Sequence, residues 1–268
     1  MSKNNLLFIG TGKMATAIAA GMIAKGFDAS QIKAFDISAQ AAEAFNLATG
    51  VEVKTQNLHA VLEQVETVIV AVKPQHIEEA LCENSDLCKN KLIISIAAGV
   101  TIAKLQELTK ATRIIRVMPN TPALVGEGAS AWSASAQVND EDIVLINEIL
   151  GSIGTICNVD EQLIDAVTGV SGSGPAYVLE FIIGLTNGGI EAGLPNNVAA
   201  ELAAQTVFGT AKLLMESGRD PASLRDEVTS PGGTTAEALA VLGEKDFKET
   251  IIEAVIAATK RSVELGKK

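Results

Sequence analysis

The first half of the chain alternates short β-branched runs with longer segments of helical spacing, and this alternation constrains the fold most. The strand candidates are NLLFIG, IKAFD, TVIVAV, KLIISIA and RIIRVM. The helices expected between them are Met14–Lys25, Ala39–Ala48, Leu58–Gln64, Pro74–Glu83 and Ile102–Leu108. GASAWSAS and GTICNV add two possible strands around a helix over Glu141–Leu150. Strands that alternate with helices form right-handed βαβ units, so we predict an α/β domain with a doubly wound parallel sheet.

From about residue 160 the pattern contains helices alone. We expect them over Ala176–Ala192, Asn197–Glu216, Thr235–Leu242 and Phe247–Leu265. Pro175 and Pro195 stand where helices should begin, and Gly193 and Gly218 where they should end. The sequence therefore predicts two domains, an α/β domain over residues 1–160 and an all-α domain over residues 161–268. Several of these helices, such as the one containing AYVLEFIIGL, are apolar around most of their circumference, which favours an intertwined homodimer.

Composition excludes several classes of partner. The formal net charge of -11 argues against nucleic acid and anionic membranes, although a local site can still bind a small anion. Neither a signal peptide nor an uninterrupted apolar run of about 18 residues is evident, so we expect no membrane span. The three cysteines, Cys82, Cys88 and Cys157, lack metal-ligand spacing, and we expect reduced thiols in a cytoplasmic protein without a metal site.

A glycine-rich turn follows the first strand at once and opens the first helix. GTGKMA, from Gly10 to Ala15, fits G-x-G-x-x-A, in which glycines let a dinucleotide pyrophosphate approach the helix amino terminus. The alternative is a turn that serves only helix–strand packing. Asp36 ends the second strand 24 residues after Gly12. An acid there accepts hydrogen bonds from the adenosine ribose and repels a 2′-phosphate, which favours NADH; capping of the next helix is the alternative.

Other candidates stand where further strands should end. Asn57 opens a helix and could either cap it or meet the adenosine half of a dinucleotide. Lys73, before Pro74, could contact the cofactor or be an ordinary solvated lysine. Ala97 to Gly99 carry small side chains that would let a flat nicotinamide ring approach the backbone. A site with few titratable groups suits hydride transfer, because the cofactor supplies the chemistry.

A second glycine-rich turn, SPGGTT, stands before a late helix. Thr234 and Glu237 fit a capping box, with Thr234 as the N-cap. The SPGG segment could also present bare backbone N–H groups beside the positive end of the helix, which would suit a carboxylate. In SGSGPAY, Ser171 to Tyr177, the glycines allow either close helix packing or a role in lining a site, and we assign no nucleophile there.

Six motifs together resemble the pyrroline-5-carboxylate reductase family: GTGKMA, AVKP, IAAGV, RVMPNTPALVGEG, TGVSGSGPAYV and SPGGTT. They run in the family's order from the first strand to the last helix. The resemblance implies a Rossmann-type domain followed by a helical dimerisation domain, with dimers that can assemble into decamers. It also implies an active site between one subunit's cofactor domain and the partner's helices. The expected reaction is hydride transfer from NAD(P)H to the C=N carbon of 1-pyrroline-5-carboxylate, giving L-proline.

The resemblance also assigns site residues. The residues expected to hold the pyrophosphate are Ile9, Gly10, Thr11, Gly12, Lys13 and Met14. Asn57 should meet the adenosine ribose, and the nicotinamide side should be formed by Ala71, Val72, Lys73 and Pro74, with Ala97, Ala98 and Gly99 flanking the ring. The substrate should be held by Ser230, Gly233, Thr234 and Thr235.

We expect the Thr235 hydroxyl to orient the ring nitrogen, which makes Thr235 the candidate catalytic residue. One position departs from the family: many members have serine where this chain has Asp36. The family commonly uses NADPH, and Asp36 makes NADH plausible as well.

Two rival functions share parts of this pattern. β-Hydroxyacid dehydrogenases have the same two-domain plan, but they carry a catalytic lysine on the first long helix of the second domain. Ala176–Ala192 contains no lysine, which counts against that reading. A nucleotide-sensing protein without catalytic activity is the second rival, and the intact SPGGTT segment argues against it.

Overall fold

The computed structural model describes residues 5–266, which form two compact units. One unit takes in the chain up to Ser173 together with the segment that starts at Ile256, and the other is Gly174–Val255. The domain boundary expected after residue 160 stays a prediction, since a division by contacts need not coincide with a division by domain. By contacts, the first helical turns after residue 160 and the end of the last helix belong with the sheet.

The first unit contains an eight-stranded sheet with the order β3-β2-β1-β4-β5-β6-β7-β8. Its strands are β1 (Leu6–Ile9), β2 (Ile32–Phe35), β3 (Val53–Lys54), β4 (Thr67–Val70), β5 (Leu92–Ser95), β6 (Arg113–Met118), β7 (Gly128–Ala134) and β8 (Gly154–Asn158). All neighbouring strands are parallel except β6 and β7. The seven strand candidates are confirmed. The edge strand β3 was missed, because two residues carry no readable alternation.

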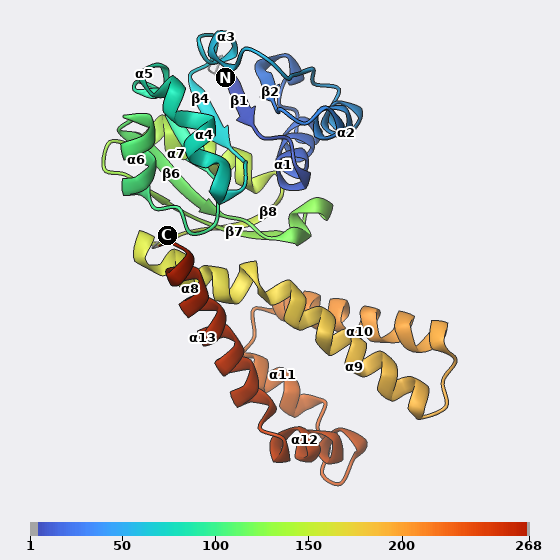
Figure 1. The fold of residues 1–268 in the computed structure, drawn as a ribbon. Coiled ribbons are helices and arrows are strands. Elements are labelled where there is room, and N and C mark those ends of the chain that lie inside the picture. Colours follow the sequence, from blue (N-terminus) through green and yellow to red (C-terminus); the bar gives the residue numbers. More distant parts are fainter. Residues whose placement is uncertain (1–4, 267–268) are drawn as a thin grey trace. The chain divides into compact units, whose positions relative to one another are not determined.

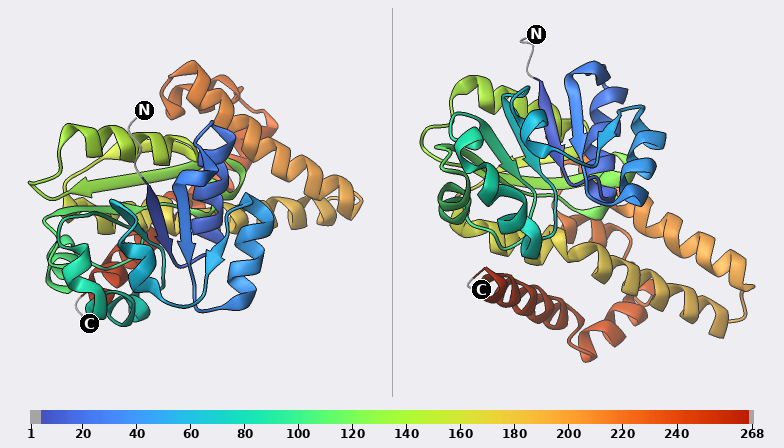
Figure 2. Two further views of the ribbon diagram at one scale, coloured as in Figure 1. Left: turned by 90° about the horizontal axis from the view of Figure 1, so that it is seen from above. Right: turned by 45° about the horizontal axis from the view of Figure 1, so that its top comes forward.

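Helices cover both faces of this sheet (Figures 1 and 2). They are α1 (Lys13–Ala24), α2 (Ala39–Thr49), α3 (Leu58–Leu62), α4 (Ile77–Leu81), α5 (Ser85–Cys88), α6 (Ile102–Thr109), α7 (Asp140–Gly151) and α8 (Ile164–Val167). Successive β1 side chains point to opposite faces: Leu6 and Phe8 enter one hydrophobic core, and Leu7 and Ile9 enter the other. Burial on both faces explains why the central strands β1, β4 and β5 are nearly continuous apolar runs.

The second unit is helical, as predicted. Its helices are α9 (Gly174–Glu191), α10 (Asn196–Ser217), α11 (Pro221–Glu227), α12 (Thr234–Glu244) and the first part of α13 (Phe247–Leu265). Gly193, with φ of 101°, follows α9, and Gly218, with φ of 61°, ends α10, so both glycines stand where the sequence placed helix ends. The short α11 was not expected.

Large apolar side chains of the second unit are exposed. Leu179, Phe208 and Met215 are 59%, 57% and 71% exposed, and within Gly174–Val255 only Ala199 and Ala203 are buried apolar residues. An apolar surface of this kind marks a contact with another molecule.

One helical stretch, Glu161–Glu191, is long and apolar enough to cross a membrane, with a mean hydropathy of 1.2. It contains a π-helical turn over Thr168–Gly172. A single stretch of this kind is weak evidence for a membrane span, because apolar helices of water-soluble assemblies reach the same length and composition.

Candidate functional site

The turn between β1 and α1 is shaped as a cradle for an anion. Gly10 has φ of +92°, and a Cβ there would lie 2.8 Å from the carbonyl carbon of Ala71, so β1 and β4 can approach only around glycine. Gly12 is the N-cap of α1, and nothing lies within 4 Å of its Cβ position. No side chain caps α1, and its first turn carries no acid. A twelve-residue helix whose first amides lack a side-chain cap suits a pyrophosphate.

Asp36 is bonded to this same turn. Its Oδ2 accepts hydrogen bonds from the Thr11 backbone N–H at 2.7 Å and from the Thr11 hydroxyl at 3.0 Å, and its Oδ1 accepts one from the Ser38 N–H at 2.8 Å. Thr11 is buried. The amide of Thr11 is therefore directed to Asp36 rather than to the open side of the turn. Ser38, not Asp36, is the N-cap of α2, so the capping alternative for Asp36 is wrong.

Two further candidates occupy helix starts. Asn57 is the N-cap of α3 in the left-handed region, with φ of 58°, and its side chain accepts a hydrogen bond from the Ala60 N–H at 3.3 Å. Capping is thus one role of Asn57. Lys73 precedes a 3₁₀ turn that begins at Pro74, and its side chain is exposed.

The residues expected beside the nicotinamide follow β4 and β5 directly. β4 leads into Ala71–Pro74, and β5 leads into Ala97–Gly99, where Ala98 is exposed and the other two residues are buried. The Ser95 hydroxyl accepts a hydrogen bond from the Ala97 N–H at 3.3 Å. Strand pairing places Ile9 beside Phe35 and Val70, and Val70 beside Ser95. The candidates all follow the carboxyl ends of parallel strands, which lie at the same side of the sheet (Figure 1). α/β folds bind ligands at this side.

In the second unit, residues Ser230 to Gly233 form a type II turn. Pro231 and Gly232, with φ of +68°, occupy its central positions, and the Gly233 N–H donates to the Ser230 carbonyl at 3.0 Å. The predicted capping box is wrong, because Gly233 is the N-cap of α12 and Thr234 is its first helical residue. No side chain caps α12. A Cβ on Gly233 would collide with the Ser230 hydroxyl, so that hydroxyl lies directly over the helix entrance.

The first part of the SGSG segment, Ser171 and Gly172, packs closely within the first unit, whereas nothing lies within 4 Å of the Cβ position of Gly174. A Cβ on Gly172 would lie 2.5 Å from Cε of Met118, and the Ser171 hydroxyl donates to the Val167 carbonyl at 3.2 Å. These contacts support the packing role among the two that the sequence left open.

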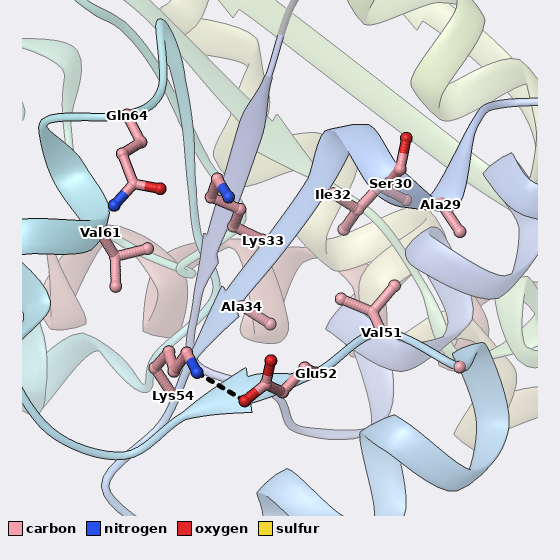
Figure 3. A pocket seen from close by; sticks show the side chains of 11 residues that line it. Ala29, Ser30, Ile32, Lys33, Ala34, Val51, Glu52, Lys54, Val61 and Gln64 are labelled. Carbon is pink, nitrogen blue, oxygen red and sulfur yellow. Dashed lines mark hydrogen bonds and ion pairs between the residues drawn. The ribbon is translucent and has the colours of Figure 1, made fainter.

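Two hollows lie among residues 5–266. One, of about 340 Å³, is lined by residues around β2 and β3, among them Lys33, Lys54 and Gln64; the Lys54 ammonium pairs with Glu52 at 2.5 Å (Figure 3). Another, of about 990 Å³, lies between the end of α1 and α7. Neither contains a residue predicted for the site.

An ion-pair cluster around the buried Arg116, here called the Arg116 cluster, was missed from the sequence. Arg116 is 3% exposed and lies 3.4 Å from both Glu161 and Asp165. Glu161 also accepts a hydrogen bond from the Ile102 N–H, and Asp165 one from the Ser262 hydroxyl, both at 2.7 Å. These partners are 45 to 97 residues apart in the chain, and no local pattern signals such contacts.

Comparison with known proteins gives two family matches and many similar chains. Residues 161–265 match the family described as pyrroline-5-carboxylate reductase dimerisation, and residues 5–99 match NADP oxidoreductase coenzyme F420-dependent. The chain is 44% identical to a pyrroline-5-carboxylate reductase of Arabidopsis thaliana, covering 97% of this chain and 94% of that protein. A pyrroline-5-carboxylate reductase of Synechocystis is 43% identical, with 97% of each covered.

Solved structures agree with these relatives. The structure of a pyrroline-5-carboxylate reductase from Coxiella burnetii has a TM-score of 0.92 and 36% identity, with 100% of each chain covered. The Plasmodium falciparum pyrroline carboxylate reductase with NADP bound has a TM-score of 0.88 and 32% identity, with 99% of each covered.

Proposed function

The chain belongs to the pyrroline-5-carboxylate reductase family, and we propose that it reduces 1-pyrroline-5-carboxylate to L-proline with NADPH, the last step of proline biosynthesis. One structural observation carries the proposal beyond the family match. Each compact unit has a glycine N-cap, Gly12 on α1 and Gly233 on α12, at a helix start that no side chain caps. One entrance suits a pyrophosphate and the other a small carboxylate.

The cofactor assignment rests on two segments at the carboxyl ends of the strands, the turn after β1 and the loop after β5. The turn at Gly10–Gly12 fits a pyrophosphate, and the small residues Ala97–Gly99 allow a flat ring to approach their backbone. NADPH is supported by the NADP oxidoreductase match over residues 5–99 and by the relative with NADP bound. When bound, the cofactor supplies a hydride; the chain's own residues provide its position and orientation.

The substrate assignment rests on the entrance of α12. The backbone N–H groups of its first turn can bind the substrate carboxylate, with the Ser230 hydroxyl beside them. Thr235, half-buried in the first turn, is the proposed catalytic residue: its hydroxyl would orient the ring nitrogen and hydrogen-bond the nascent amine. Reduction of a protonated imine needs no strong base on the protein.

The two histidines fit this view. His59 and His76 lie on exposed helical surface, 4.0 Å from Glu63 and 3.8 Å from Glu79 respectively. In each case the carboxylate lies about one turn further along the same surface. Neither has a role in the proposed reaction.

The proposed assembly is a homodimer formed through the helices of residues 161–265, with further association into decamers. It is supported by the dimerisation match and by the exposed apolar residues of α9 and α10. We place the enzyme in the cytoplasm, with neither nucleic acid nor a membrane as partner, on the strength of its acidic charge and its three unpaired cysteines.

Turnover tests the proposal directly. The purified chain is mixed with 1-pyrroline-5-carboxylate and either NADPH or NADH, and both nicotinamide absorbance and proline are followed. We expect cofactor oxidation that depends on the substrate and matches the proline formed. No oxidation with either cofactor refutes the proposal. Cofactor oxidation that requires a β-oxo acid in place of the imine would favour the rival dehydrogenase.

A further inference from the structure

The Arg116 cluster contacts the segment that leads from β5 into α6. Glu161 Oε1 accepts the Ile102 N–H at 2.7 Å, and Ile102 is the first residue of α6. At the other end of this segment, the Ser95 hydroxyl accepts the Ala97 N–H. The loop Ala97–Gly99 therefore lies between two hydrogen-bonded anchors, and Glu161 provides the anchor on the helix side.

Asp165, the second acid paired with Arg116, is linked to the same loop through the last helix. Asp165 on α8 accepts the Ser262 hydroxyl of α13 at 2.7 Å, and Figure 1 shows the end of α13 beside α8. Four residues after Ser262, Gly266 directly follows α13, and its backbone meets the loop. A Cβ on Gly99, which has φ of +78°, would lie 3.3 Å from the Gly266 nitrogen, and a Cβ on Gly266 would lie 2.7 Å from the Gly99 oxygen.

Arg116 joins the two acids. Its side chain is 4% exposed, and its two terminal nitrogens face one carboxylate each, at 3.4 Å. The buried guanidinium holds both carboxylates in place, because without it two partly buried acids would lie near each other with no positive partner. The loop is thus held from Ile102 and from Gly266 by one connected set of side chains.

We propose that Glu161 and Asp165, joined by Arg116, are positioning residues that hold Ala97–Gly99 in place for the nicotinamide end of the cofactor. The inference rests on the proposed function, since it takes this loop as the nicotinamide side of the site. Neither acid touches the reacting atoms. Their effect is on the placement of a loop backbone, and hydride transfer is sensitive to displacements of about 1 Å.

The dissociation constants of variants distinguish a role in positioning the loop from a role in the stability of the fold alone. Glu161→Ala removes the acceptor at Ile102, whereas Glu161→Gln keeps an acceptor oxygen. The matched control is Asp142→Asn, which removes the charge of Asp142 on α7 that pairs with Arg113 on β6 at 2.9 Å. Melting temperature is measured for every variant. Binding is measured for NADPH and for 2′-phospho-ADP-ribose, which lacks only the nicotinamide.

For Glu161→Ala we expect kcat/KM to fall about tenfold or more and the Kd of NADPH to rise about threefold or more, with the Kd of 2′-phospho-ADP-ribose changed less than about twofold. Glu161→Gln should recover most of the loss. Asp142→Asn should lower the melting temperature without changing either Kd. Equal weakening of both ligands by Glu161→Ala, or kinetics and binding within about twofold of the wild type, overturns the inference.

The two proposals fail in different ways. If the wild type does not reduce 1-pyrroline-5-carboxylate but Glu161→Ala still weakens NADPH selectively, the proposed function fails and the positioning role stands. If the wild type turns the substrate over and Glu161→Ala binds both ligands normally, the positioning role fails alone. Ser262→Ala is a second, milder variant, and it should shift NADPH binding in the same direction.

Discussion

Replacing Asp36 with serine should change the cofactor preference of the enzyme. The carboxylate accepts three hydrogen bonds, two of them from Thr11 in the cofactor-binding turn, at 2.7 and 3.0 Å. The carboxylate lies at the end of β2, beside the place where an adenosine 2′-phosphate would lie, and it carries the charge that would repel that phosphate. In Asp36→Ser that charge is gone, and a hydroxyl can restore only part of the hydrogen bonding.

Simple electrostatics gives the size of the effect. A phosphate with about two negative charges, placed about 5 Å from a carboxylate at an effective dielectric constant of about 40 to 80, is repelled by roughly 2–3 kcal/mol. Salt screening lowers this to about 1–2 kcal/mol, and about 1.4 kcal/mol is tenfold in binding. We therefore expect the ratio of kcat/KM for NADPH over NADH to rise about tenfold, mainly through a lower KM for NADPH.

Stability should fall as well, because the half-buried carboxylate accepts bonds from the buried Thr11. Charge-assisted hydrogen bonds contribute about 1.5–3 kcal/mol each when buried, and partial exposure reduces the expected loss to about 1–2 kcal/mol in total. Denaturant unfolding measures it.

The control is Asp28→Ser, at the other end of β2. There a carboxylate accepts the Ser30 N–H at 2.9 Å, and that backbone hydrogen bond lowers the pKa of Asp28. This variant should leave the cofactor ratio unchanged. The reasoning is refuted if the NADPH-to-NADH ratio of kcat/KM changes less than about twofold in Asp36→Ser. It is also refuted if Asp28→Ser changes that ratio by as much as Asp36→Ser does.

Three further predictions concern single residues. Thr235→Ala should lower kcat/KM more than about tenfold with Thr235→Ser largely active; a change within about twofold, or ~0.4 kcal/mol, removes its catalytic role. Gly10→Ala should destabilise the fold by about 1–3 kcal/mol in denaturant unfolding, whereas Gly12→Ala should fold normally and bind NADPH more weakly. The opposite pattern would contradict the proposal that this turn binds the pyrophosphate. Burial raises the pKa of the Cys88 thiol to about 11, so alkylation near pH 8 should spare it and label the two exposed cysteines. The contribution of the neutral thiol to the free energy of unfolding should be lost as pH rises from about 9 through 11. Labelling of Cys88 in the native protein would contradict its burial.

The sequence predicted elements whose signal is local and repeated. β1 and β4 were readable because both faces are buried, and α1 because a glycine turn precedes it. β3 was not, since an edge strand of two residues needs little apolar sequence. The capping box at Thr234 fitted a pattern, but Gly233 takes the extended N-cap conformation, with φ of −82° and ψ of 170°, and Thr234 enters the helix.

Long-range contacts lay beyond such reasoning. The acid at position 36 was identified as a cofactor determinant, but not its bonds to Thr11, because those depend on how β1 and β2 pair. Arg116 read as an ordinary strand residue within RVMPNTPA. Its acidic partners belong to a segment expected in the other domain, so no spacing rule could join them.

Deuterium transfer tests the central claim most directly. The enzyme is supplied with 1-pyrroline-5-carboxylate and NADPH that carries deuterium at the transferable position of nicotinamide C4, and the proline formed is examined by NMR and mass spectrometry. We expect one deuterium per proline, on the ring carbon that was double-bonded to nitrogen in the imine. Proline without deuterium, or with deuterium at another carbon, would contradict this claim.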